Sequence, residues 1–131
     1  MSQQFNQDAV QVTAISIIAA TETQAVLGNF LNPPYGGCKA VVSAFVMLTV
    51  GTGITSVSVR IRRNPNSENV VVGGPAGVTV VAGNVVLLPV ILTDIIPDGR
   101  PVQYQVTVQQ AGGAGNGTAN IATVDATLIS G

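Results

Sequence analysis

The chain has 131 residues, of which 47% are hydrophobic and only 8% are charged, with a formal net charge of −1. Ordinary soluble domains have about 25% charged residues, so charge repulsion does little to keep this chain soluble as a free monomer. There is no histidine and a single cysteine, Cys38, which excludes an intrachain disulfide and removes the commonest general base and zinc ligand.

Two explanations fit so little charge. Either Ser, Thr, Asn and Gln cover the outer faces of the protein, or neighbouring molecules cover much of its surface. With only five Lys and Arg side chains, no nucleic-acid partner is expected. The most apolar stretch, residues 40–50, is shorter than the roughly 20 residues of a membrane helix, so no membrane partner is expected either.

The pattern along the chain predicts an all-β fold. Val, Ile and Thr are abundant, Gly and Pro recur at short intervals, and helix signals are nearly absent. About eight short strands of this kind predict an antiparallel β-sandwich of the jelly-roll type. Residues 1–9 are predicted to form a flexible polar arm and residues 10–131 a single domain. Strands are expected at 10–19, 24–27, 39–50, 55–63, 69–72, 78–81, 84–92, 102–109 and 119–129.

Two of these strands carry local irregularities. In the first, apolar residues stand at even positions up to Ala14 and then at Ile15 and Ile17, which indicates a bend or burial on both faces. Pro89 lies inside the strand at 84–92. Because proline cannot donate a ladder hydrogen bond, that strand is predicted to lie at a sheet edge or to carry a bulge.

The strand at 39–50 is apolar on both faces. One face carries the even-numbered residues, and the other carries Val41, Phe45 and Met47 together with Ser43 and Thr49. In a two-sheet sandwich only one of these faces meets the opposite sheet, so the other needs a different cover. We therefore predict that Val41, Phe45 and Met47 form an interface between subunits.

Arg60, Arg62 and Arg63 form the one basic cluster in the sequence. Alternation along the strand at 55–63 places Arg60 and Arg62 on a polar face. The cluster is a candidate contact for an acidic partner, and the alternative is a solvated face that blunts pairing at the sheet edge.

No catalytic, cofactor-binding or metal-binding residues are predicted. The glycine-rich loop at 111–117 lacks the Gly-Lys-Ser/Thr ending of a phosphate-binding loop and no helix follows it, so a flexible hairpin loop is expected. The carboxylates are scattered and are expected to be turn residues or solvated strand ends. They are Asp8, Glu22, Glu68, Asp94, Asp98 and Asp125.

Four segments carry a resemblance to a known class: residues 21–23 (TET) after the first strand, 56–63 (SVSVRIRR), 81–86 (VAGNVV) and 102–108 (VQYQVTV). Their arrangement over residues 10–129 resembles the jelly rolls of the tumour-necrosis-factor/C1q-like class, which includes small phage proteins that decorate or cement capsids. The resemblance implies a homotrimer on a virion surface, with the inner sheet of each subunit facing the three-fold axis and the major capsid protein as a partner.

These observations favour a non-enzymatic virion protein that stabilises a capsid and needs no cofactor. The polar start of the chain lacks the basic and apolar blocks of a secretory signal, so synthesis in the host cytoplasm is expected. One alternative is a receptor- or glycan-binding module of a tail fibre, with loops 32–37 and 111–117 as the recognition elements. An enzyme on a β-sandwich is another, which the missing histidine and scattered carboxylates disfavour.

Overall fold

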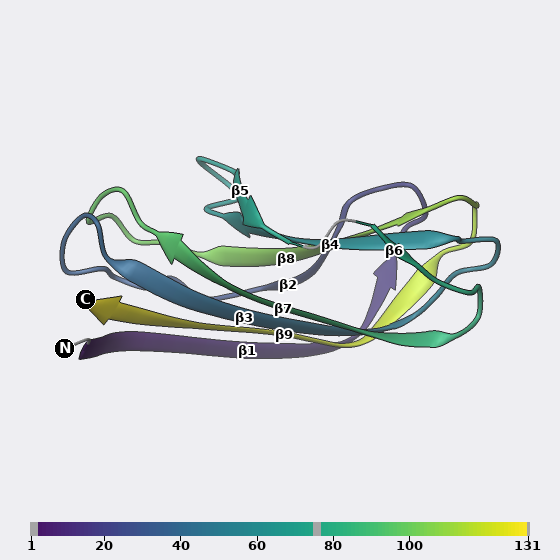
Figure 1. The fold of residues 1–131 in the computed structure, drawn as a ribbon, viewed down its shortest axis with the longest axis horizontal. Coiled ribbons are helices and arrows are strands. Elements are labelled where there is room, and N and C mark those ends of the chain that lie inside the picture. The colour runs from purple at the N-terminus through teal and green to yellow at the C-terminus, as the bar shows by residue number, and fades with distance from the viewer. Residues whose placement is uncertain (1–2, 75–76, 131) are drawn as a thin grey trace.

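The computed structural model describes residues 3–74 and 77–130, and every regular element in them is a β-strand. The strands form the two layers of a sandwich, seen from the side in Figure 1. They are β1 (Gln3–Ile17), β2 (Thr23–Leu27), β3 (Lys39–Thr49), β4 (Ser56–Arg63), β5 (Val70–Gly73), β6 (Val78–Thr79), β7 (Val85–Ile95), β8 (Tyr104–Ala111) and β9 (Gly117–Ser130).

The strand order is that of a jelly roll. Sheet A has the order β1-β9-β3-β7, and sheet B has the order β2-β8-β4-β5, with β6 also paired to β4. Strands β5 and β6 pair with opposite ends of β4 and so occupy one position, which leaves eight positions in the two sheets. The predicted fold class is therefore confirmed, and all pairings are antiparallel.

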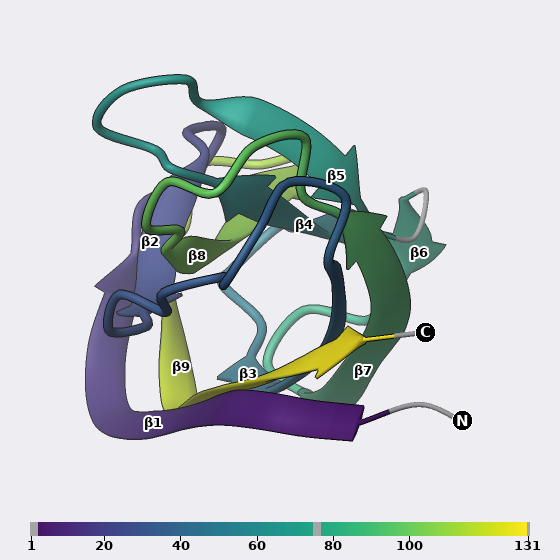
Figure 2. The same cartoon turned by 90° about the vertical axis from the view of Figure 1, so that its left-hand side faces the viewer.

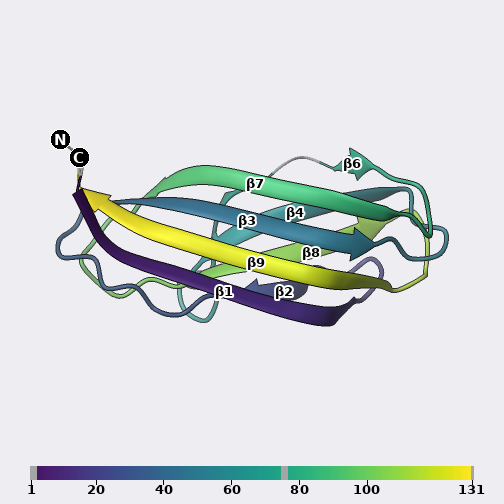
Figure 3. The ribbon, with the colours of Figure 1, turned by 90° about the horizontal axis from the view of Figure 1, so that it is seen from below.

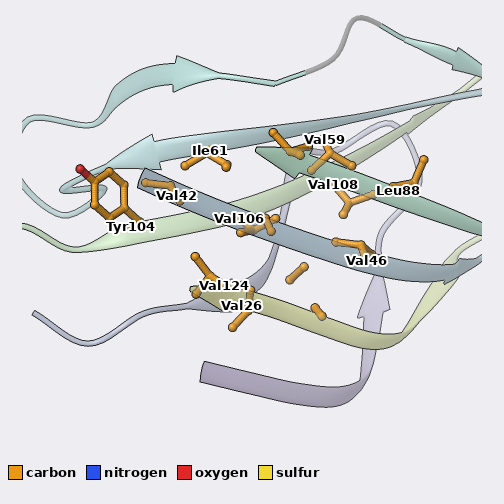
Figure 4. Close-up of a cluster of buried hydrophobic side chains, with 14 of the residues drawn as sticks. Val26, Val42, Val46, Val59, Ile61, Leu88, Tyr104, Val106, Val108 and Val124 are labelled. Carbon is orange, nitrogen blue, oxygen red and sulfur yellow. The ribbon is translucent and has the colours of Figure 1, made fainter. Parts of the chain in front are cut away.

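The core lies between the two sheets and is built from small and β-branched side chains. Alternation along β3 buries Ala40, Val42, Ala44, Val46 and Leu48 at 0–2% exposure. Val59 and Ile61 of β4 and Val106 and Val108 of β8 meet them from sheet B (Figure 4). β-Branched residues pack well on pleated surfaces, and alanines let the sheets approach.

The first strand bends where the sequence changes its alternation. Ala14 has a φ of 56°, a conformation that is costly for a residue with a Cβ. Before it, Val10 and Val12 pack against the core, and after it Ile15 and Ile17 do. The bend carries the end of β1 towards β2 of the other sheet and closes one side of the sandwich (Figure 2).

The start of β1 differs from the prediction of a flexible arm at residues 1–9. Strand β1 begins at Gln3 and pairs with β9 as far as Ser130. Because β9 extends to the end of the described chain, its backbone groups are available to residues 3–9, and pairing satisfies both strands. Residues 1 and 2 lie outside the described residues.

Candidate assembly surface

The three residues predicted to form an interface share one surface. Val41, Phe45 and Met47 lie on the outer face of sheet A, away from the core, and are half-buried by neighbouring strands. Figure 3 views this outer face, with β7, β3, β9 and β1 side by side in that order. The structure thus places the three side chains on one surface.

Strand β7 extends this surface with side chains that are more exposed than those of β3. Val85, Leu87, Ile91 and Ile95 are exposed by 56%, 59%, 74% and 62%. They project from the same face as the odd-numbered residues of β3, because the register places Leu87 opposite Met47. We call the odd-numbered residues 41–47 of β3 and 85–95 of β7 the apolar face, which includes Ser43 and Thr93.

The other half of the outer face is more polar. Strand β9 presents Thr123, Asp125 and Thr127 there, and Gln11 of β1 lies opposite Thr123. A shallow groove of about 330 Å³ over this half includes Gln11, Ser43, Thr123 and Asp125 in its lining. An apolar centre beside a polar border is the usual composition of a protein–protein interface.

The free edge of β7 is interrupted at its middle. Strand β7 is the last strand of sheet A, which confirms the edge position predicted from Pro89. Its ladder with β3 runs from Val85 to Ile95 without a register shift. Pro89 has no N–H and therefore fits this ladder only at a position that donates no hydrogen bond to β3. Such positions are the odd-numbered residues, if their N–H and C=O groups point to the free edge. A strand approaching that edge would find no donor at Pro89.

Arg60 and Arg62 lie on the outer face of sheet B, where Glu22 holds them. The Glu22 carboxylate accepts hydrogen bonds from Arg62 Nη2 at 2.8 Å and from Arg60 Nη1 at 3.3 Å. The pKa of Glu22 is lowered from 4.5 to about 2, mainly by the hydrogen bond from Arg62. Burial opposes this shift, whereas the hydrogen bond from Thr107 and the charges of Arg62 and Arg60 add to it. These arginines already have an acidic partner within the chain.

The structure places Arg63 apart from the other two arginines. It is 8% exposed and points into the sandwich, where its Nη1 donates to both Asp94 oxygens at 2.8 and 2.9 Å. Burial alone would lower the pKa of Arg63, but the hydrogen bond and charge of Asp94 raise it. The guanidinium is therefore committed to a contact between the sheets and is not offered to a partner.

Asp94 was expected to be a turn residue or a solvated strand end, and the structure buries it at 7% exposure. Besides Arg63, it accepts a hydrogen bond from the Tyr104 hydroxyl at 2.7 Å. Burial and the neighbouring carboxylate raise the pKa of Tyr104. This group of three links β7 of sheet A to β4 and β8 of sheet B.

The two loops considered for recognition lie at opposite ends of the sandwich. Loop 32–37 precedes β3, whereas loop 111–117 leads into β9 beside the end of β3, since Thr49 pairs with Thr118. The second loop connects two different sheets and is not a hairpin. It packs on turn 51–53 so closely that a Cβ at Gly51 would collide with the Gly115 carbonyl oxygen. One site cannot include both loops.

Sheet B carries a groove in the described part of the chain. It measures about 530 Å³, and its polar lining includes Ser56, Ser58, Arg60 and Gln109.

Among the described residues, no three His, Cys, Asp or Glu side chains gather as metal ligands would. Residues 3–74 and 77–130 contain no helix with the length and apolar character to cross a membrane.

Comparisons with known proteins identify a similar fold. No protein-family model matches the chain, and no curated protein matches it by sequence. Among solved structures, the VP2 subviral particle of infectious bursal disease virus matches with a TM-score of 0.59 and 9% identity, over 96% of this chain and 37% of that one. The T13 particle of the same virus matches with a TM-score of 0.57 and 11% identity, over 96% and 35%.

The chain thus spans little more than a third of the length of the viral chains that it matches. At such low identity the likeness concerns the fold alone. The chain is a jelly-roll domain of the kind found in a viral particle protein.

Proposed function

We propose that this chain is a non-enzymatic structural protein of a virion, which binds the capsid surface as a homo-oligomer and stabilises it. The observation that carries the proposal is the apolar face of sheet A. Its four most exposed side chains on β7 are aliphatic, and such surfaces on soluble proteins usually mark contacts with other molecules. The fold shared with a viral particle protein is consistent with this role.

The partners in this proposal are further copies of the chain and the major capsid protein. A trimer is the proposed stoichiometry, from the resemblance to the tumour-necrosis-factor/C1q-like class. In this proposal the chain is a phage decoration protein, which is synthesised in the host cytoplasm and then added to the particle.

Electron microscopy of particles purified from cells that produce the chain tests this function. We expect density of the size of this jelly roll on the outer surface of the capsid. Two results together would refute the proposal: the purified particles lack the chain, and the purified protein does not bind when it is added to capsids.

A receptor- or glycan-binding module is the second candidate, favoured by two exposed aromatic side chains. Phe30 and Tyr35, both on the β2–β3 connection, are exposed by 60% and 47%. Aromatic rings offer flat apolar surfaces with which ligands can stack. A glycan array distinguishes this candidate: binding that Tyr35→Ala abolishes would support it, and an array without any binding would reject it.

A further inference from the structure

The apolar face is large enough to be a contact of its own. With a rise of about 3.4 Å per residue and a spacing of about 4.8 Å between strands, β3 and β7 together present about 350 Å² over eleven residues, and the polar border on β9 adds about 180 Å². The largest apolar patch on a typical monomer has about 300–600 Å² and is often functional. The exposed residues Leu87 and Ile91 lie near its middle.

The chemistry of the apolar face specifies an apolar partner. Lys39 is the one charged side chain on the outer side of β3 and β7 in the described structure, and it lies at one end of β3. Charge complementarity therefore cannot select the occupant. Elsewhere in the described residues the exposed large hydrophobic side chains are dispersed over connections and the short strands β5 and β6. They are Ile18, Phe30, Tyr35, Val70, Val71, Val78 and Val81.

The surface of this chain that matches the apolar face best is the same face on another copy. Contacts of this kind gather about a symmetry axis, as in most homo-oligomers. The polar strands β9 and β1 would then form the border of the contact, where Asp125 keeps access to water.

Pairing through the edge of β7 is the competing way for two copies to associate. Such pairing extends a sheet through backbone hydrogen bonds. Pro89 removes the donor at the middle of this edge, five residues into an eleven-residue strand. Because the apolar face is continuous whereas the edge of β7 lacks a donor at Pro89, packing on the apolar face is favoured over pairing at the edge.

We propose that a second copy of this chain packs on the apolar face, with Leu87 and Ile91 of β7 at the centre of the contact. This inference rests on the proposed function, because it names the partner and the surface through which the subunits assemble. Two such faces bury about 700 Å², and about 1,000 Å² together with their polar borders on β9, which is the low end of specific interfaces. Association in solution is then weak and concentration-dependent, and repeated contacts on a particle strengthen it.

Sedimentation velocity over a concentration series from about 1 µM to about 1 mM tests the contact. We expect the wild type to sediment faster as concentration rises, and Ile91→Asp to weaken association at least about tenfold. Val71→Asp is the matched control, since Val71 is also an exposed strand valine (49%) but lies on β5 of the other sheet. It should behave as the wild type.

Two results would overturn the inference: a wild type that stays monomeric throughout, or an Ile91→Asp variant that associates as the wild type does. Circular dichroism establishes that each variant is folded. If Ile91→Asp does not fold, Ile91→Thr keeps the β-branched shape that suits a strand and takes its place with the same expected direction.

Particle binding separates this inference from the proposed function. A chain that associates through Ile91 but never binds capsids refutes the virion role and supports the contact. A monomeric chain whose capsid binding is lost in Ile91→Asp shows that the capsid occupies the face, which refutes the contact between copies and supports the virion role.

Discussion

Asp94→Ala is expected to destabilise the protein by about 3–5 kcal/mol, the usual cost of breaking a buried ion pair on one side. The substitution removes the acceptor of two hydrogen bonds from Arg63, at 2.8 and 2.9 Å, and of one from Tyr104, at 2.7 Å. Arg63 keeps Glu68 at 3.4 Å. Because that contact is longer and Glu68 is more exposed, it compensates only in part, and a value near the lower end is expected.

The measurement is equilibrium unfolding in guanidinium chloride followed by circular dichroism, with free energies compared at constant slope. Arg100→Ala is the control. Its ion pair with Asp98 has an N–O distance of 3.6 Å and an Arg100 side chain that is 84% exposed. Exposed pairs contribute about 0–1 kcal/mol, so this variant should unfold almost as the wild type.

The double variant Arg63→Met/Asp94→Leu separates the ion pair from the packing around it. With both charges replaced by apolar side chains of similar volume, most of the lost stability should return. The Tyr104 hydroxyl, left without its acceptor, should still cost about 1 kcal/mol. The reasoning is refuted if Asp94→Ala costs less than about 1 kcal/mol, or if the double variant is as unstable as Asp94→Ala alone.

Three further variants or conditions test other parts of the structure. The pKa of Glu22 is lowered from 4.5 to about 2, so the stability from its pair with Arg62 is present above pH 4.5 and is lost as the pH falls towards 2. The loss should be about 1 kcal/mol, because the site is partly exposed. Unfolding measured over an acid titration should show this loss in the wild type and not in Glu22→Gln. Gln110→Leu leaves the Gly51 N–H, now bound at 2.9 Å, without its acceptor, and unfolding in denaturant should show a cost of about 1–3 kcal/mol. Pro89→Val restores the donor at the edge of β7, and light scattering should detect more aggregation than in the wild type; unchanged scattering would contradict the blocked edge.

Alternation made much of the fold predictable from the sequence. The strands β4 and β8 are half-buried ladders whose apolar residues recur at every second position, and this period directly reports which side faces the core. The change of alternation at Ala14 likewise marked a true bend. Pro89 marked a sheet edge, because only an edge tolerates a missing donor in an unbroken ladder.

The partner of Arg63 could not be predicted in the same way. Asp94 is 31 residues away in the chain and lies on the other sheet, and nothing local joins the two. A weaker signal was present: Arg63 shares the odd positions of Val59 and Ile61, which face the core. Two opposite charges on inward positions of apolar strands suggest a buried pair, because a single buried charge is too costly.

The sequence could not predict which side of β7 is exposed, because of its composition. Residues 85–92 are all apolar, so no alternation distinguishes the side that faces the core from the side that faces solvent. Only the register with β3 shows that Leu88 and Val90 face inwards while Leu87 and Ile91 are exposed. The surface on β3 for which an interface is predicted continues onto β7, which carries its more exposed half.

The two sides of β7 favour different kinds of association, and the sequence disfavours one of them. Pairing at a strand edge can continue without limit and leads to fibres, whereas contacts between faces about a symmetry axis close after a few copies. Pro89 interrupts the edge, and Leu87 and Ile91 on the same strand supply the face. Asp94 ties this strand to sheet B through Arg63 and Tyr104. The proposed role as a subunit of a particle requires contacts that close. Strand β7 fits that proposal, because it combines a blocked edge with an apolar face and is fixed to sheet B through Asp94.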